Sequence, residues 1–308
     1  MKRTKNPAKE AEYRKRAADL VAQMTLHEKV SQMLSWAPAI ERLGIPAYNW
    51  WSEGIHGVGR AGTATVFPQA IGMAAAFDED MMEQVGNAIG VEARGKYNMC
   101  RAHGDRDIFK GLTVWAPNIN IFRDPRWGRG HETYGEDPFL TSRLGVRFVE
   151  GMQGNDPDYL QAAACAKHFA VHSGPESDRH HFNAIVSKQD LWETYLPAFR
   201  ALVKEAGVEA VMGAYNRTNG EPCCGSKTLL KDILRDKWHF DGHVTSDCWA
   251  IKDFHTGHMV TDGPVESVAL AVNNGCDLNC GDLYVYLEQA VAEGKLSEEK
   301  IDESLTRL

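Results

Sequence analysis

A closed α/β barrel of the (β/α)8 type is the fold that this sequence predicts. Short apolar runs alternate with longer amphipathic stretches along most of the chain, which is the pattern of parallel βαβ units. The chain has 308 residues, and about 250 residues is the usual size of such a barrel. No Pro/Gly/Ser-rich hinge and no internal repeat divides it. We therefore expect one barrel domain over residues 18–308 after an N-terminal extension over residues 1–17.

The elements can be placed in order along the chain. Apolar residues recur at helical spacing from Glu10 to about Ser35, and Thr25 precedes Glu28 as in a capping box, which predicts a helix, a cap and a second helix. The apolar runs predict strands at 112–116, 162–166, 210–214 and 243–246. The amphipathic stretches predict helices at 79–98, 138–151, 188–205, 229–237, 265–274 and 283–293. Residues 297–308 are helix-prone and end without a stop signal, so we expect that the chain is cut there.

Charge and hydropathy exclude several classes of protein. The 34 basic and 42 acidic residues give a net charge of −8, which argues against a nucleic-acid surface. No run of 18 apolar residues predicts a membrane span, and the basic N-terminus is not followed by the short apolar region of a signal peptide. We expect a cytoplasmic protein from the chain as it stands, or a secreted or periplasmic one if a leader has been removed.

The cysteine and histidine patterns predict neither a metal site nor another cofactor. The seven cysteines form no pair of CxxC motifs, so we expect mostly reduced thiols. A vicinal disulfide between Cys223 and Cys224 is the alternative. Four histidines cluster in the sequence without an HExxH motif or a carboxylate triad; they are His168, His172, His180 and His181.

Polar residues that follow the predicted strands are the candidates for chemistry, because catalytic side chains of these barrels come from the carboxyl ends of strands. They lie in the loop 123–132, in the pair Lys167-His168, in the segment 215–217 and at Asp247. An earlier loop, 48–53, combines three aromatic residues with Glu53. Carboxylates, cationic donors and aromatic faces together are typical of a carbohydrate pocket.

Each of these signals also has a purely structural interpretation. Arg123 or Arg126 could tie its loop to Glu132 or Glu136, and Asp247 could cap a helix. Lys167 and His168 could form a satisfied core pair, while Trp50 and Trp51 could belong to the core. Two cations at the end of one buried strand need carboxylates nearby, however, and this favours a functional site.

Several long motifs, taken in order, resemble glycoside hydrolase family 3 over residues 18–308. They are MTLHEKVSQM, YNWWSEGIHGV, TVFPQAIGMAAAFD, NINIFRDPRWGRGHETYGEDP, KHFAVHSGPESDRHHFNA, VMGAYNRTNGEPCCGS and GHVTSDCWAI. YNWWSE, YNRTNG and the Ser-Asp-Cys run resemble the β-xylosidase-like branch more than the β-glucosidase-like one. The resemblance implies a retaining exo-glycosidase that removes terminal β-D-xylose, or β-D-glucose, from a small oligosaccharide or glycoside.

The same resemblance implies the roles of individual residues. Asp247 matches the nucleophile that forms the glycosyl-enzyme intermediate, and Tyr215 matches the tyrosine beside it. The positions that hold the sugar hydroxyls are matched by Glu53, Arg129, Lys167 and His168. Nearby cations such as Lys167 and Arg129 are expected to lower the pKa of Asp247.

The resemblance leaves the acid/base open. In two-domain members it is a Glu of an α/β sandwich domain that follows the barrel, so we expect a C-terminal domain of the same polypeptide. The alternative is a single-domain β-N-acetylglucosaminidase, in which Asp178 and His180 would form the catalytic dyad. A barrel that binds glycans without turnover is the non-enzymatic alternative. The sequence does not determine the oligomeric state.

Overall fold

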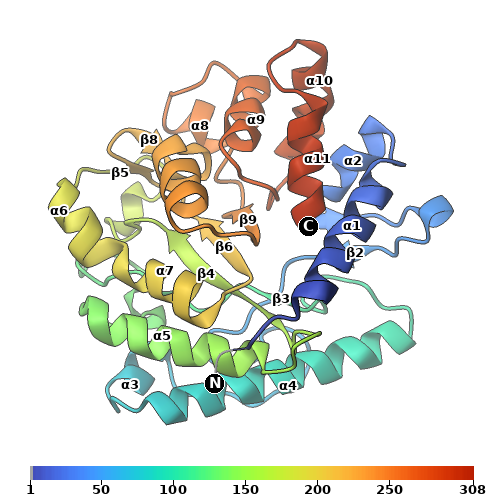
Figure 1. Ribbon diagram of the computed structural model, residues 1–308. Coiled ribbons are helices and arrows are strands. Elements are labelled where there is room, and N and C mark those ends of the chain that lie inside the picture. The colour runs from blue at the N-terminus through green and yellow to red at the C-terminus, as the bar shows by residue number, and fades with distance from the viewer. Residues whose placement is uncertain (1–2) are drawn as a thin grey trace.

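The computed structural model describes residues 3–308 and has the TIM-barrel-like fold that the sequence predicts (Figure 1). Its central sheet is parallel, in the order β3-β4-β6-β9. These strands are β3 (Thr113–Val114), β4 (Ala163–Phe169), β6 (Ala210–Gly213) and β9 (His243–Ser246). All four expected strands are present, and helices join them on the outside of the sheet (Figure 1).

Single bridges extend this sheet into a ring. Ser52 pairs in parallel with Val114 on one side, and Leu278 pairs in parallel with Thr245 on the other. Leu34 then pairs in parallel with Asn279. The ring closes where β1 (Trp36–Ala37) meets β2 (Tyr48–Asn49), and these two strands are antiparallel. The connection between them contains only a short 3-10 turn, so no helix separates these strands.

The helices agree with the expected amphipathic stretches. Near the N-terminus, α1 (Pro7–Val21) and α2 (Leu26–Gln32) flank the capping box in which Thr25 and Glu28 bond each other's backbone. The remaining α-helices are α3 (Ala70–Ala74), α4 (Glu79–Ala102), α5 (Pro138–Gln153), α6 (Lys188–Asp190), α7 (Pro197–Ala201), α8 (Asp253–Thr256), α9 (Pro264–Asn273), α10 (Leu287–Ala292) and α11 (Glu298–Arg307).

Two expected helices are less regular than their sequence patterns imply. The stretch 188–205 contains α6 and α7 together with the π-helical segments Leu191–Tyr195 and Leu202–Ala206. The stretch 229–237 lies in a π-helical segment, Lys227–Lys237. Outside the ring, β5 (Asn183–Ala184), β7 (Arg217–Thr218) and β8 (Glu221–Pro222) form a separate small sheet.

The two ends of the described chain lie together against the barrel wall. α1 packs on α11, and the range of α1 crosses residue 17, where we placed the end of the extension. Arg307 on α11 donates to the buried carboxylate of Asp277, which also accepts from Arg235. The pair between Arg307 and Asp277 fixes α11 to the segment that follows α9, next to the bridge residue Leu278.

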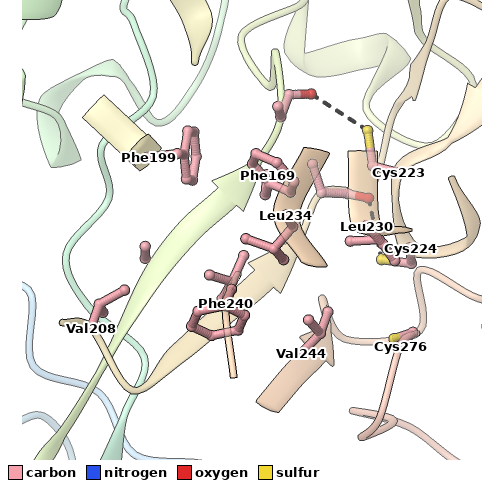
Figure 2. Close-up of a cluster of buried hydrophobic side chains, with 14 of the residues drawn as sticks. Phe169, Phe199, Val208, Cys223, Cys224, Leu230, Leu234, Phe240, Val244 and Cys276 are labelled. Carbon is pink, nitrogen blue, oxygen red and sulfur yellow. Dashed lines mark hydrogen bonds between the residues drawn. The ribbon is translucent and has the colours of Figure 1, made fainter. Parts of the chain in front are cut away.

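The hydrophobic core lies between the sheet and its covering helices (Figure 2). Phe169 of β4 and Phe199 of α7 meet edge to face with ring centroids 4.9 Å apart. Cys223 and Cys224 are both buried free thiols at the edge of this cluster, so the vicinal disulfide is not formed. Burial raises the pKa of both thiols and keeps them protonated.

Candidate active site

The predicted site residues meet at one end of the barrel, because parallel strands present their carboxyl ends to the same face. Lys167 and His168 stand near the end of β4, and Asp247 directly follows β9. Tyr215 lies two residues beyond β6, and Glu53 follows the ring residue Ser52. Arg129, from the long loop after β3, lies close enough to Asp247 to lower the pKa of its carboxyl.

Asp247 is a buried carboxylate with one oxygen uncommitted. Its residue surface is 7% exposed, and Oδ1 accepts a hydrogen bond of 2.8 Å from the backbone N–H of Cys248. Oδ2 lies 3.6 Å from Nε2 of His168 and has no hydrogen-bond partner among residues 3–308. Because α8 begins only at Asp253, without a side-chain cap, Asp247 does not cap that helix.

The environment pulls the pKa of Asp247 in two directions. Burial raises this pKa above its usual value, since a low-dielectric site disfavours the charged form. Arg129 and Lys167 oppose the rise, as do the Cys248 N–H and the Tyr215 hydroxyl. The two cations lower the pKa as the sequence analysis expects, but burial outweighs them and the net result is a raised pKa.

Asn120 fixes the orientation of His168. The Asn120 side chain accepts from the His168 backbone N–H at 2.8 Å and donates to the His168 carbonyl at 2.8 Å. Its Oδ1 also lies 2.9 Å from Nδ1 of the ring. Burial and the nearby cations hold the pKa of His168 well below its usual value. The ring is therefore neutral, donates through Nδ1 to Asn120, and presents the lone pair of Nε2 to Asp247.

Arg129 is held by a carboxylate of its own loop. Its guanidinium donates to Glu132 through two bonds of 2.9 and 2.7 Å, a bidentate geometry that fixes the plane of the group. Burial alone would raise the pKa of Glu132, but the bonds from Arg129 lower it below its usual value. Asn118 donates a further bond of 3.4 Å to Glu132. Arg129 thus brings a fixed positive charge to the site.

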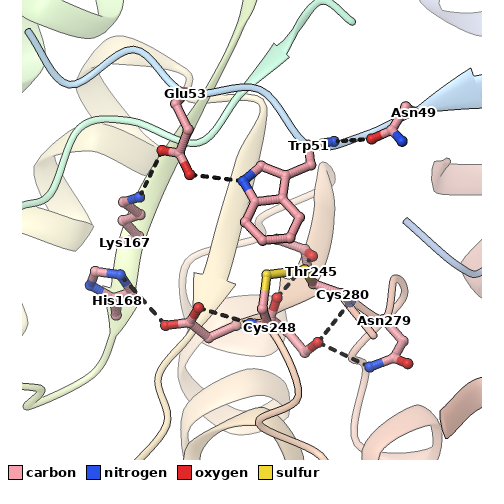
Figure 3. Close-up of a disulfide and its surroundings, with 11 residues drawn as sticks. Asn49, Trp51, Glu53, Lys167, His168, Thr245, Cys248, Asn279 and Cys280 are labelled. Atoms are coloured by element: carbon pink, nitrogen blue, oxygen red, sulfur yellow. Dashed lines mark hydrogen bonds and ion pairs between the residues drawn. A yellow bond between two sulfur atoms is a disulfide. The ribbon is translucent and has the colours of Figure 1, made fainter. Parts of the chain in front are cut away.

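Glu53 lies between a cation and an aromatic donor (Figure 3). Its carboxylate is 3.9 Å from Nζ of Lys167 and accepts a bond of 2.8 Å from Nε1 of Trp51. The Trp51 ring is stacked on that of Trp115, with centroids 5.6 Å apart. Trp50 packs edge-on against Tyr48 and His243, and its ring nitrogen has no hydrogen-bond partner among residues 3–308. Of the two neighbouring tryptophans, Trp51 is therefore the one linked to the polar site.

A disulfide joins Cys248 to Cys280 beside the candidate nucleophile (Figure 3). The other five cysteines are free thiols, as the expectation of mostly reduced thiols had it, and this pair is the exception. No sequence pattern predicts this bond, because the two residues are 32 positions apart in different loops and become neighbours only when the ring closes. The pair packs in a small cluster with Trp115, Cys165 and other buried side chains.

The loop arginines find partners that differ from those we weighed. Arg126 forms an ion pair with Asp124, and Arg123 lies over the rings of Phe182 and Tyr195. Glu132 is held by Arg129 instead. The structural interpretation is therefore right in kind for Arg126, with a different carboxylate.

Comparison with known proteins identifies the family. Residues 16–308 match the model of the glycosyl hydrolase family 3 N terminal domain. This chain belongs to glycoside hydrolase family 3. It is 49% identical to a xylan 1,4-beta-xylosidase of Xylanibacter ruminicola over 96% of this chain and 35% of that protein. It is 44% identical to the probable beta-D-xylosidase 7 of Arabidopsis thaliana over 96% of this chain and 40% of that protein.

Solved structures agree with this assignment. A family 3 exo-beta-xylosidase in complex with a xylobiose aziridine probe matches with a TM-score of 0.90 and 34% identity, over 96% of this chain and 39% of that one. A β-glucosidase from Erythrobacter marinus matches with a TM-score of 0.83 and 29% identity, over 96% of this chain and 44% of that one. The chain thus spans about two fifths of the length of the relatives it matches.

The dyad of the single-domain alternative is not assembled as the sequence predicts. Nδ1 of His180 lies 2.8 Å from Oδ2 of Asp253, so His180 takes its carboxylate from α8 and not from Asp178. Asp253 is a residue that the sequence analysis missed. The only signal for it was its place six residues after Asp247.

Over residues 3–308, no three His, Cys, Asp or Glu side chains gather in a way that could hold a metal ion. In that same range, no helix has the length and apolar character needed to cross a membrane.

Proposed function

We propose that this chain is the nucleophile-bearing barrel of a retaining exo-glycosidase that removes terminal β-D-xylose, or β-D-glucose, from oligosaccharides. The observation that carries the proposal is the uncommitted Oδ2 of Asp247, a buried carboxylate oxygen at the barrel mouth with Arg129, Lys167 and His168 around it. Identity of 44–49% to named xylosidases supports the substrate class.

The chemistry follows from the residue types. Asp247 attacks the anomeric carbon, the glycosidic bond breaks, and the leaving oxygen must receive a proton. The resulting ester is then hydrolysed by water, which forms the new C–O bond and loses a proton to the same acid/base group. We propose that the acid/base is a Glu in a further domain of the longer protein, because the site carboxylates Glu53 and Glu132 are already engaged by Trp51, Lys167 and Arg129. That domain is a partner we expect from the same polypeptide.

The other candidate residues each contribute to binding the sugar or to positioning the nucleophile. Arg129 and Lys167 present N–H donors, and Glu53 presents acceptor oxygens, so together they can grip the hydroxyls of one sugar ring. His168 offers the acceptor Nε2 beside the nucleophile. Tyr215 places its hydroxyl next to Asp247, where it stabilises the carboxylate form.

The disulfide bears on where the protein works. Disulfides persist in oxidising compartments and are rare in the reducing cytosol. The Cys248–Cys280 bond therefore supports the secreted or periplasmic alternative over the cytoplasmic one.

Covalent trapping tests the proposal. We expect a 2-deoxy-2-fluoro-β-xyloside with a dinitrophenolate leaving group to add one fluorosugar to the chain, because such a leaving group needs no proton from an acid. Peptide mapping should place the adduct on Asp247, and Asp247→Ala should remain unlabelled. Labelling of another residue, or of none, contradicts the proposal.

Aryl glycosides separate the alternatives. Aryl β-xyloside, β-glucoside, α-arabinofuranoside and N-acetylglucosaminide are assayed with this chain and with a C-terminally extended one. Turnover of the xyloside that appears only in the extended chain supports the proposal. Turnover of the N-acetylglucosaminide by the barrel alone supports the single-domain alternative, and binding without turnover in both chains supports a glycan-binding barrel.

A further inference from the structure

The Tyr215 ring is enclosed by side chains from the loop that follows β4. The His180 ring meets it edge to face, with centroids 4.9 Å apart and planes at 73°. The guanidinium carbon of Arg179 lies 5.7 Å from the centre of the same ring. His172 approaches it from the barrel side at 6.0 Å. The direction of the Tyr215 hydroxyl, which lies beside Asp247, thus depends on where this loop stands.

Asp253 fixes the loop from the opposite side. Its Oδ2 bonds Nδ1 of His180 at 2.8 Å, and the carboxylate is largely buried. The His180 side chain is 51% exposed, so water could otherwise let it turn. With Asp253 on its ring nitrogen and Tyr215 against its ring edge, His180 has one orientation available.

Hydrogen bonds and close packing join the loop that follows β4 to the loop that follows β9. Arg217 donates to the His181 carbonyl at 3.0 Å and to the His258 carbonyl at 3.4 Å. Gly257 lies so close to the His180 carbonyl that a Cβ at this position would collide with it. The loop after β4 and the loop after β9 are therefore joined directly above Tyr215, which follows β6.

Burial and nearby charged groups distinguish the pair of His180 and Asp253 from an ordinary surface ion pair. Burial raises the pKa of Asp253, whereas His180 and His181 lower it and the negative charge of Asp247 raises it further. Burial and the nearby cation Arg217 lower the pKa of the adjoining His258 to about 4, so this ring is neutral. By contrast, the pair formed by His27 and Glu288 has side chains that are 84% and 44% exposed.

We propose that Asp253 is a positioning residue that acts through His180, so that the pair holds the Tyr215 ring with its hydroxyl beside Asp247. The inference rests on the proposed role of Asp247. It assigns to His180 the task of orienting a neighbour instead of transferring a proton, and it explains why a carboxylate from α8 reaches across to the loop after β4.

The test compares variants by the rate of covalent labelling of Asp247 with the dinitrophenyl fluoroxyloside, followed by intact-protein mass. His180→Phe keeps a ring against Tyr215 but cannot bond Asp253, and Asp253→Ala removes the bond from the other side. We expect each to slow labelling about tenfold or more, because a displacement of about 1 Å at a reacting group can cost up to about 100-fold. In His180→Phe, which keeps the Asp253 carboxylate, the acidic limb of the rate should move to higher pH, since the Tyr215 hydroxyl is one of the groups that favour ionised Asp247.

Two further variants separate positioning from stability. The double variant Asp253→Ala/His180→Phe should be no slower than either single one, because both changes break the same contact. Asp253→Asn keeps an acceptor oxygen and should recover part of the rate. His27→Phe, which breaks the exposed pair, should label at the wild-type rate. If Asp253→Ala melts at a lower temperature yet labels with the wild-type rate and pH profile, the pair is only structural and the inference is wrong.

A crystal structure of Asp253→Ala tests the inference independently of the chemistry. We expect the Tyr215 hydroxyl to have left Asp247. A Tyr215 ring in its original place contradicts the inference even if the proposed function fails, whereas unlabelled wild-type protein contradicts the proposed function alone.

Discussion

Nε2 of His168 and Oδ2 of Asp247 face each other at 3.6 Å, and neither atom has a hydrogen-bond partner among residues 3–308. With Nδ1 bonded to Asn120 and the ring neutral, both atoms present lone pairs. Two buried acceptors at this distance repel each other unless a proton lies between them. The raised pKa of Asp247 is consistent with this arrangement, because protonating the carboxyl gives His168 a donor. A proton or a hydroxyl group that donates to one of these two atoms removes the repulsion.

Replacing Asp247 by Asn should stabilise the folded protein at neutral pH. Because folding raises the pKa of Asp247 above 3.8, the native state holds this proton more tightly than the unfolded chain does. The free energy of unfolding then falls as the pH rises from 3.8 through the raised pKa of Asp247. Asn does not ionise, so Asp247→Asn removes this loss of stability. We expect Asp247→Asn to raise Tm at pH 7 and to have a smaller effect near pH 3. Thermal unfolding monitored by circular dichroism measures both.

Asp124→Asn is the control of opposite sign. Bonds from Arg126 lower the pKa of Asp124 to about 2, so its contribution to stability is present above the ordinary carboxyl pKa and is lost as the pH falls through that value. Asp124→Asn should therefore not raise Tm at pH 7. A lower Tm for Asp247→Asn at pH 7 contradicts the raised pKa.

Loss of the Arg129 charge should move the acidic limb of the pH profile of the labelling rate to higher pH. Arg129 is the first of the groups that offset the effect of burial on the pKa of Asp247, so Arg129→Gln leaves less to oppose that effect. The rate of fluoroxyloside labelling between pH 3 and pH 8 measures the limb. Arg126 lies in the same loop, is largely exposed and pairs with Asp124, so Arg126→Gln should leave the limb unchanged. An unshifted limb in Arg129→Gln would mean that Arg129 does not influence the nucleophile.

Asn120 should be important for stability as well as for the site. Asn120→Leu removes three hydrogen bonds to His168 and leaves its buried backbone groups unpaired. We expect a loss of about 2–4 kcal/mol in the free energy of unfolding, measured by urea denaturation. Xylose affinity, measured by calorimetry, should fall because the His168 ring can then turn. A variant of wild-type stability would show that water replaces the amide.

Reduction of the disulfide should destabilise the barrel. Cys248 and Cys280 are 32 residues apart, and a cross-link of this span typically contributes about 2–4 kcal/mol. We expect a reductant to lower Tm of the wild type. The variant Cys248→Ser/Cys280→Ser should melt at the reduced value and be insensitive to reductant. If the wild type melts at the same temperature with and without reductant, the bond contributes nothing measurable.

Much of the fold was predictable because its signals are local. The alternation of short apolar runs with amphipathic stretches placed all four strands of the central sheet, and the capping box at Thr25 placed the start of α2. The strand-end rule then selected Lys167, His168 and Asp247. The bridges at Leu34, Ser52 and Leu278 were missed, because one or two paired residues are too few to leave a periodic pattern.

By itself, the sequence determined the barrel, the family and the set of residues at the strand ends, since alternation and motif order are properties of neighbours in the chain. Only the tertiary structure decided which distant residues become partners. It placed Asp253 on His180, Asn120 on His168 and Cys280 on Cys248. It also decided the sign of the pKa shift of Asp247, because burial is set by everything that packs around a carboxylate and not by the cations nearest to it.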